Sequence, residues 1–379
     1  MGIIKTNYGE PSYTISNELV SVFVTVQAGH LTASFDKGAN KTVEPFFIPP
    51  WWREAQDQDL DAILNVLRGD FFCFPFGANE DAYADKKYPV HGKTANANWD
   101  FVSLKEDGTK KELTLGMELD YEEGTVNKII SLRKNEPIIY NSHAISGFTG
   151  RIPIGHHPTL QLPEREGAGI IDISAPLAGF TTPEPIEDPQ MGGYSQLQPN
   201  YEITDRSKVL CMNGQSVDLT RYPGPKGFDD IVLFLNDSAR EFAYTAISLP
   251  DEGYLYFNLK NPRVLSSTLL WMPNGGRHYA PWNGRVSSAI GMEEITGFYH
   301  YGIKASVENN FLQEKGYKTY VDIDGKPFEV KLIMGLIPID QDFQGVEDIV
   351  RKDSASITII GRGGEKIDVP CQVDFLRSA

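Results

Sequence analysis

The stretch Leu19–Val26 has the sequence Leu-Val-Ser-Val-Phe-Val-Thr-Val, in which β-branched and aromatic residues dominate. Such residues favour the extended backbone of a β-strand. Similar short runs recur almost to the end of the chain, separated by glycine, proline, asparagine and aspartate. They are Leu113–Leu119, Lys128–Leu132, Ile138–Ser142, Ile231–Leu235, Tyr254–Leu259, Leu265–Trp271, Phe328–Met334 and Ser356–Ile360. Many strands at short spacing predict an all-β fold, a large antiparallel β-sandwich with a few short helices.

Helical periodicity is present in two segments, Asp57–Leu67 and, more weakly, Asp342–Arg351. In the first, apolar residues recur at the i, i+3, i+4, i+7 spacing of one helix face. They are Leu60, Ile63, Leu64 and Leu67. The most irregular stretch, Thr181–Asn200, is rich in proline, glycine, glutamine and acidic residues, which predicts a long surface loop. Because strand patterns resume after it without a change in composition, we expect residues 1–379 to form one domain.

The charge of the chain excludes several classes of partner. Its 51 acidic and 35 basic residues give a formal net charge of −16 over 379 residues. A chain of this charge is repelled by phosphate backbones and by anionic lipids, so we expect it to bind neither nucleic acid nor membranes. There is no apolar run long enough to span a bilayer and no signal-peptide pattern at the N-terminus. We therefore expect a cytoplasmic protein, either a monomer or a homodimer.

The three cysteines, Cys73, Cys211 and Cys371, lie far apart in the sequence and show no metal-ligand spacing. Neither a zinc site nor a disulfide framework is expected from this pattern. Cys73 lies in the apolar run 71–76 and is predicted to be a small buried hydrophobic residue.

Histidine is the natural proton-transfer group near neutral pH, and the chain has seven. Three of them, His30, His143 and His300, stand alone in strand-like or turn contexts and are best explained as structural residues. His91 is followed by Gly92, and a glycine at this point lets the backbone approach a neighbouring group closely. Upstream, Arg68 precedes a run of aromatic residues, a combination that suits hydroxyl groups and the apolar face of a sugar.

His156 and His157 are adjacent, and adjacent residues on a strand point to opposite faces. At most one of them can therefore face a given pocket, so this geometry does not predict a metal site built on the pair. The same alternation applies to Glu293 and Glu294, one of which is a candidate carboxylate base. An exposed strand end is the structural alternative for the two glutamates. Asp229, at the start of a strand, is most simply a turn residue.

Taken together and in this order, these segments resemble the galactose mutarotase (aldose 1-epimerase) superfamily. Its ordered motifs are matched by Arg68, His91-Gly92, His157, Gly227-Phe228-Asp229 and Met292-Glu293. The first segment is more similar to the hexose-6-phosphate mutarotase branch. The resemblance covers Arg68 to about Glu294 and implies the large antiparallel sandwich of that family.

The sequence departs from the family pattern at three places. Thr159 and Leu160 replace the tyrosine and phenylalanine that follow the catalytic histidine. Lys93 and Thr94 stand where the hexose-6-phosphate branch has Phe-Ala, and the segment 268–271 lacks the glutamine often found before the last motif. These departures imply that the contacts that recognise the sugar differ from those of the well-known galactose enzymes.

The resemblance implies a mutarotase that interconverts the α and β anomers of a sugar without a metal or organic cofactor. It assigns Glu293 as base, His157 as acid and His91 as a further catalytic group near the ring oxygen. By the same resemblance, Arg68 and Asp229 bind ring hydroxyls. Two alternatives stay open: a non-catalytic carbohydrate-binding protein, or a relative of glycoside hydrolases and lyases in which Asp229 or Asp230 acts with Glu293.

The loop Arg277–Arg285 is an addition to this pattern. Its two arginines and His278, beside Trp282, have the chemistry to receive a charged or extended sugar. Arg277 and Trp282 are therefore candidate substrate-binding residues. The alternative is a solvated loop in which the arginines stack on neighbouring side chains.

Overall fold

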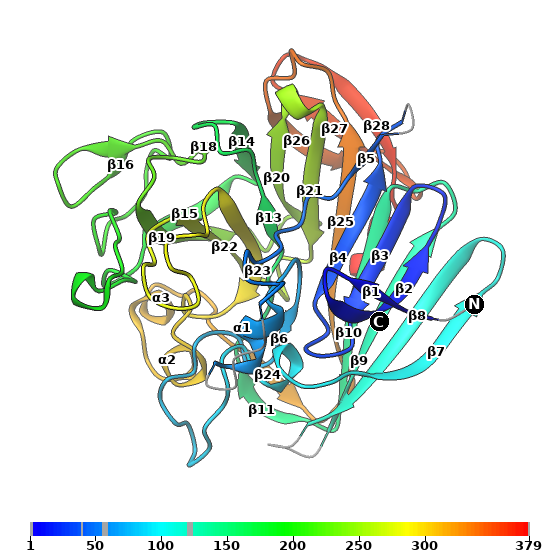
Figure 1. Cartoon of the computed structure of the whole chain (residues 1–379), viewed down its shortest axis with the longest axis horizontal. Helices are drawn as coiled ribbons and strands as arrows, with labels where there is room; N and C mark the ends of the chain where they lie inside the picture. Colours follow the sequence, from blue (N-terminus) through cyan, green and yellow to red (C-terminus); the bar gives the residue numbers. More distant parts are fainter. Residues whose placement is uncertain (1–2, 39–40, 55–59, 120–123, 378–379) are drawn as a thin grey trace.

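Two large antiparallel sheets form the body of the protein (Figure 1). The computed structural model describes residues 3–38, 41–54, 60–119 and 124–377. A nine-stranded sheet has the order β18-β14-β20-β21-β25-β10-β9-β8-β7. Its strands are β7 (Asp100–Glu106), β8 (Lys110–Glu118), β9 (Thr125–Arg133), β10 (Ile138–Ser146), β14 (Gly169–Ile173), β18 (Arg221–Tyr222), β20 (Ala243–Leu249), β21 (Tyr254–Lys260) and β25 (Phe328–Pro338).

The second sheet has the order β15-β19-β22-β23-β12-β6, with β13 paired to β23 beside β12. Its strands are β6 (Phe72–Cys73), β12 (Ile154–His156), β13 (Thr159–Gln161), β15 (Pro176–Thr181), β19 (Phe228–Asn236), β22 (Ser267–Asn274) and β23 (Ala289–Thr296). Side chains of this sheet meet those of the nine-stranded sheet in the interior; for example, Asn258 of β21 donates to the Met292 carbonyl of β23 at 3.2 Å.

Smaller sheets complete the fold. The N-terminal five-stranded sheet contains β1 (Ile4–Asn7), β2 (Glu10–Ser16), β3 (Val20–Thr25), β4 (Leu31–Asp36) and β5 (Thr42–Val43). The C-terminal one contains β26 (Val346–Arg351), β27 (Ser356–Gly361) and β28 (Lys366–Pro370). Two-stranded pairs are β11 (Thr149–Ile152) with β24 (Val321–Asp324), and β16 (Val209–Leu210) with β17 (Ser216–Val217).

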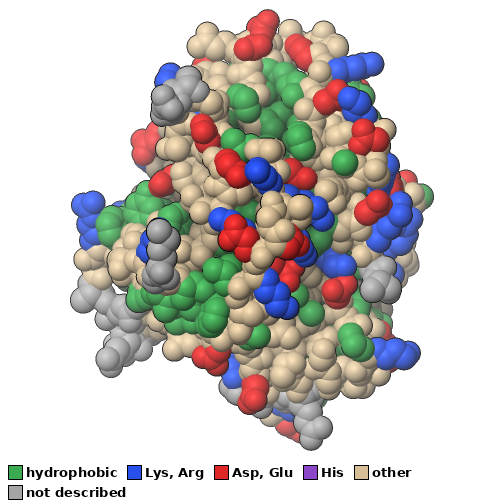
Figure 2. All heavy atoms as spheres, turned by 90° about the vertical axis from the view of Figure 1, so that its right-hand side faces the viewer, with side chains coloured by type: hydrophobic (Ala, Val, Ile, Leu, Met, Phe, Trp, Pro, Cys, Tyr) green, Lys and Arg blue, Asp and Glu red, His purple; other side chains and the backbone are tan. Residues whose placement is uncertain are grey.

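The helices of the described residues are all short. They are α1 (Ala62–Val66), α2 (Ile303–Val307), α3 (Phe311–Glu314) and the 3-10 turns η1 (Lys93–Ala95), η2 (Pro189–Met191), η3 (Pro250–Glu252) and η4 (Val373–Leu376). None of these helices has the length and apolar character needed to cross a bilayer. On the face that carries β2, β7 and β8, acidic and basic side chains are interspersed (Figure 2).

The strand predictions are confirmed, because each of the nine predicted runs overlaps an observed strand. The helix predicted over 57–67 is confirmed in its second half as α1, and residues 57–59 lie outside the described part of the chain. The helix predicted over Asp342–Arg351 is wrong. Its second half forms β26, which pairs with β27 and buries Val346 and Ile349. The β-branched residues of this segment favour a strand once a partner strand is available.

The interior between the two large sheets contains charged groups as well as hydrocarbon. Lys260 of β21 and Glu294 of β23 form an ion pair in which both side chains are fully buried. Thr268 of β22 joins them, donating to Glu294 at 2.8 Å and accepting from Lys260 at 3.1 Å. Burial favours the neutral amine and so lowers the pKa of Lys260, while Glu294 opposes that shift.

We expect Lys260→Met to destabilise the protein by about 3–5 kcal/mol, because it leaves the Glu294 charge buried without its partner. The double variant Lys260→Met/Glu294→Gln removes that unpaired charge and should recover most of the loss. Urea unfolding monitored by tryptophan fluorescence measures both effects. A double variant no more stable than Lys260→Met would show that the loss does not come from an unpaired charge on Glu294.

Candidate active site

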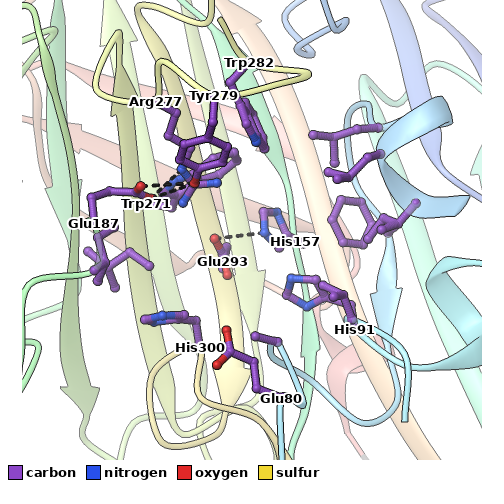
Figure 3. Close-up of a pocket in the computed structure, with 18 residues that line it drawn as sticks. Glu80, His91, His157, Glu187, Trp271, Arg277, Tyr279, Trp282, Glu293 and His300 are labelled. Carbon is purple, nitrogen blue, oxygen red and sulfur yellow. Dashed lines mark hydrogen bonds and ion pairs between the residues drawn. The ribbon is translucent and has the colours of Figure 1, made fainter. Parts of the chain in front are cut away.

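A cavity of about 260 Å³ opens on the side of the seven-stranded sheet that faces away from the nine-stranded sheet. Trp271 of β22 and Glu293 of β23 form its floor, together with His157, which follows β12 (Figure 3). The floor has room for the Glu293 carboxylate because Gly291 lies two residues earlier on the same face. A Cβ atom at Gly291 would lie 2.8 Å from Glu293 Oε1, so any larger residue would displace this carboxylate.

Glu293 and His157 form the central pair of the cavity. His157 Nε2 lies 3.1 Å from Glu293 Oε1, and both side chains are nearly fully buried. On its other side, His157 Nδ1 lies 3.1 Å from the Thr159 hydroxyl, which in turn donates to the His157 carbonyl at 3.3 Å. A hydroxyl that donates to this carbonyl accepts from Nδ1–H, which leaves Nε2 free to accept a proton from Glu293. Thr159, one of the departures from the family pattern, therefore orients the histidine.

The backbone at His157 is fixed by a buried carboxylate. The His157 amide lies within 3.0 Å of both Phe71 O and Asp70 Oδ1. The other oxygen of Asp70 lies 3.1 Å from His156 Nδ1, on the interior side of the sheet. One aspartate therefore contacts both adjacent histidines from below the cavity floor.

Aromatic rings enclose the His157 imidazole. Phe71 stacks on it with ring centroids 4.4 Å apart, and Trp271 meets it edge-on at 5.7 Å. Such burial disfavours charge, and it lowers the pKa of His157 to about 3. Burial acts in the opposite direction on Glu293. It raises the pKa of this carboxyl well above its ordinary value, although Arg277 partly opposes the shift. Burial therefore favours the neutral forms of both groups when the cavity is empty.

Arg277 is held between two carboxylates at one side of the cavity. Its Nε lies 2.7 Å from Glu187 Oε1 and 3.3 Å from Asp229 Oδ2. The guanidinium also lies over the rings of Trp282 and Trp271, at 4.8 and 5.4 Å from their centroids. Although burial favours its neutral form, Asp229 and Glu187 raise the pKa of Arg277 above its ordinary value. Arg277 is thus a permanently charged and fully paired group.

Asp229 joins this cluster to the floor. Its Oδ1 accepts the indole N–H of Trp271 at 2.7 Å. Burial raises the pKa of Asp229 to about 6, although Arg277 opposes the shift. Asp229 thus fixes Trp271 and Arg277, and it is not among the residues whose side chains line the cavity.

His91 and His300 lie on the remaining side of the cavity, with Glu80 near its entrance (Figure 3). The Gly77 amide donates to His91 Nδ1 at 3.3 Å, so the neutral ring carries its proton on Nε2. Gly92 is required at its position, because it has a φ of +77° and a Cβ there would lie 1.9 Å from the Phe74 carbonyl oxygen. The close backbone approach predicted for the His-Gly pair is confirmed.

The structure brings most of the predicted site residues together. His91, His157, Glu293, Arg277 and Trp282 all line the cavity. As alternation predicts, His156 and Glu294 point into the interior, where they contact Asp70 and Lys260.

Arg68 differs from expectation. Its buried guanidinium donates to the carbonyls of Val66 and Asn7, both at 3.0 Å, and it does not line the cavity. The arginine holds the N-terminal sheet against the segment after α1, and this geometry does not support the predicted contact with a ring hydroxyl.

Several cavity residues were not identified from the sequence. Glu187 belongs to the segment predicted to be a surface loop, and it reaches the cavity because Arg277 and Tyr279 bind it; the Tyr279 hydroxyl donates to it at 3.0 Å. His300 was assigned a structural role, but it lines the cavity, and burial lowers its pKa to about 4. No local pattern marks either residue.

Among the described residues, no group of three or more His, Cys, Asp or Glu side chains is arranged to hold a metal ion.

Because the pKa of Asp229 is raised, the difference in unfolding free energy between the wild type and Asp229→Asn should depend on pH. A carboxyl whose pKa rises from 3.8 to about 6 on folding holds its proton more tightly in the folded state. The wild type should therefore lose about 2 kcal/mol of unfolding free energy relative to the variant between pH 4 and pH 7. Urea unfolding at several pH values measures this change, and a difference that stays constant with pH would contradict it.

Comparisons with known proteins agree with this architecture. No protein-family model matches the chain, and no curated protein matches it. Solved structures do match. A galactose mutarotase-like protein from Clostridium acetobutylicum has 11% sequence identity and a TM-score of 0.60, with 89% of this chain and 98% of that one covered.

Two further structures are similar over nearly the same lengths. A galactose mutarotase related enzyme from Lactobacillus acidophilus has 13% identity and a TM-score of 0.53, and covers 87% of this chain and 98% of its own. A candidate aldose 1-epimerase from Escherichia coli K12 has 12% identity and a TM-score of 0.56, and covers 86% of this chain and 99% of its own. At sequence identities this low, the similarity to these structures establishes the fold and nothing about the activity. The chain has the galactose mutarotase-like fold of these aldose 1-epimerase-type structures.

Proposed function

We propose that the protein is a sugar mutarotase of the aldose 1-epimerase type, which interconverts the α and β anomers of a sugar. The observation that carries this proposal is the buried Glu293–His157 pair, 3.1 Å apart, on the floor of a cavity large enough for a monosaccharide. An acid and a base in direct contact suit a reaction that moves one proton off a substrate and another onto it.

The proposed reaction opens the ring and closes it on the other face. The reaction starts from the form of the pair in which the shared proton has moved from Glu293 to His157. Ionised Glu293 takes the proton from the O1 hydroxyl, the C1=O1 double bond forms, the C1–O5 bond breaks, and protonated His157 gives its Nε2 proton to O5. After rotation about C1–C2, the neutral His157 takes the proton back from O5, which attacks the other face of C1. Glu293 then returns its proton to O1, so that atoms and charges balance and no redox or metal chemistry is needed.

The surrounding residues have supporting roles in this proposal. His91 presents Nε2–H toward the cavity, where it can donate a hydrogen bond to the ring oxygen as charge develops. The indoles of Trp271 and Trp282 offer apolar surface to the C–H bonds of the sugar. Glu187 and Tyr279 provide oxygens for hydroxyl groups on the Arg277 side of the cavity.

The hydrolase alternative in which Asp229 or Asp230 acts with Glu293 is less well supported, because neither aspartate is free to face Glu293. Asp230 accepts the backbone amides of Gln196 and Leu197 at 3.1 Å and does not line the cavity. Asp229 is bound to Trp271 and Arg277. The other alternative, a non-catalytic sugar-binding protein, would bind the sugar without speeding the interconversion of its anomers.

Glu293→Gln should keep the shape of the cavity floor but cannot accept the O1 proton. We expect anomer interconversion to slow by at least about 100-fold, with sugar binding retained. His157→Asn should cause a similar loss, because each ring opening uses both groups. Anomeric exchange in NMR, measured as the rate in excess of buffer, tests both variants. Full activity in Glu293→Gln would assign the base to another residue, and binding without any excess rate in the wild type would indicate a binding protein.

The shifted pKa values predict an unusual pH profile. The active pair carries one proton, shared between Glu293 and His157. On the acid side a second proton binds His157, whose pKa is about 3, so kcat/KM should stay high well below pH 6.5. On the alkaline side activity should fall as Glu293 loses its proton, above the ordinary carboxyl range. An acid limb near pH 6.5 would contradict the buried geometry of His157.

A further inference from the structure

The wall of the cavity next to His157 is made of hydrocarbon. Ile63 and Leu64 of α1, and Leu67 directly after it, line the cavity together with Phe71 and Val90. Phe71 connects this wall to the reaction centre, because it belongs to the same buried cluster as Ile63 and Leu67 and stacks on His157. We call these five residues the aliphatic wall.

Backbone groups of α1 that would otherwise attract a hydroxyl are already bonded inside the protein. The Leu64 carbonyl accepts the indole N–H of Trp51 at 2.7 Å, and the Val66 carbonyl accepts Nε of Arg68 at 3.0 Å. The aliphatic wall therefore presents side-chain hydrocarbon to a ligand. A hydroxyl placed against such a surface loses its water without gaining a partner.

The charges around the cavity disfavour an anionic ligand. Among the described residues that line it, Arg277 is the only lysine or arginine, and Glu187 and Asp229 already neutralise it. Glu80 adds a further acidic group. The possibility that Arg277 receives a charged sugar is therefore not supported by its surroundings, because a phosphate or carboxylate would meet more negative charge than positive.

The proposed reaction orients the sugar relative to these two sides. His157 gives its proton to the ring oxygen O5, and C5 is bonded directly to O5. The substituent on C5 must then lie beside His157, where the aliphatic wall begins. Glu187 and Arg277 lie on the other side of Glu293 from His157 (Figure 3), so in this orientation they face the hydroxyl-bearing part of the ring and not the C5 substituent.

We propose that the cavity selects uncharged aldoses that carry a methyl group or a hydrogen at C5, namely 6-deoxyhexoses and pentopyranoses. Hexoses with a hydroxymethyl group are poorer ligands, and 6-phosphates and uronic acids are excluded. This inference rests on the proposed function, because the mutarotase reaction fixes which side of the sugar faces His157.

Matched sugars differing only at C6 test the selectivity: 6-deoxygalactose against galactose, and 6-deoxyglucose against glucose and glucose 6-phosphate. Binding is measured by the fluorescence of the cavity tryptophans and by calorimetry, and turnover by anomeric exchange in NMR. We expect each 6-deoxy sugar to bind more tightly, and to have a kcat/KM higher by about 10-fold or more, than its 6-hydroxy counterpart. Equal or tighter binding of the hexoses, or of the 6-phosphate, would overturn the inference.

Leu64→Gln tests whether the aliphatic wall is the cause. Leu64 is only partly buried, so a polar residue is tolerated there, and its amide gives a C6 hydroxyl a partner. The preference for 6-deoxy sugars should fall at least about threefold. Leu104→Gln is the matched control, since Leu104 is 46% exposed on β7 and outside the cavity, and it should leave the preference unchanged. Equal preferences in wild type and Leu64→Gln would overturn the role of the wall.

The two proposals fail in different ways. Preferential binding of 6-deoxy sugars without an excess rate on any sugar would support the selectivity and refute the mutarotase. An excess rate that is equal for 6-deoxy and 6-hydroxy sugars would support the mutarotase and refute the selectivity. The absence of binding by every sugar in the panel would overturn both.

Discussion

The alternation of side chains along β23 is the constraint on which the site depends. Glu293 faces the cavity and His157, while Glu294 faces the interior and pairs with Lys260. A shift of one residue in the pairing of β23 would turn each glutamate to the opposite face of the sheet, and in either direction at least one of the two carboxylates would lose its partner. The ion pair therefore favours the register that places Glu293 beside His157.

The same arrangement recurs at the end of the neighbouring strand β12, where His156 points inward and His157, directly after the strand, points outward. Asp70 contacts the ring of His156 and accepts the backbone amide of His157. Burial by itself raises the pKa of Asp70, but His156, Lys128 and the His157 amide together lower it, so this carboxylate remains ionised in the interior. The buried charge is tolerated because these partners bond it. Through the same bonds it positions the two adjacent histidines.

Much of the fold and of the cavity floor could be predicted from the sequence, because both follow from local pattern. The period of two in the strand runs predicts the sheets, and it separates Glu293 from Glu294 and His157 from His156. What the sequence did not show depends on long-range contacts. The segment 342–351 became a strand because β27 lies beside it, and Arg68 was bound by the Val66 and Asn7 carbonyls. Glu187 and His300 enter the cavity only through the packing of distant loops.

Burial of the Glu293–His157 pair has a chemical consequence beyond shielding it from water. With ordinary pKa values of 4.5 and 6.5, the imidazole would hold the shared proton about 100-fold more tightly than the carboxylate. A pair with that imbalance would be well suited to one half of the proposed reaction and poorly suited to the other, because the two groups exchange roles between ring opening and ring closure. Burial raises the proton affinity of the carboxylate and lowers that of the imidazole, so that in the empty cavity the shared proton lies on Glu293. Arg277, held at the cavity by Glu187 and Asp229, acts in the opposite direction by favouring ionised Glu293. The aromatic enclosure and the fixed arginine therefore oppose each other at the carboxylate, and that opposition suits the proposed reaction, in which each group both gives and accepts a proton.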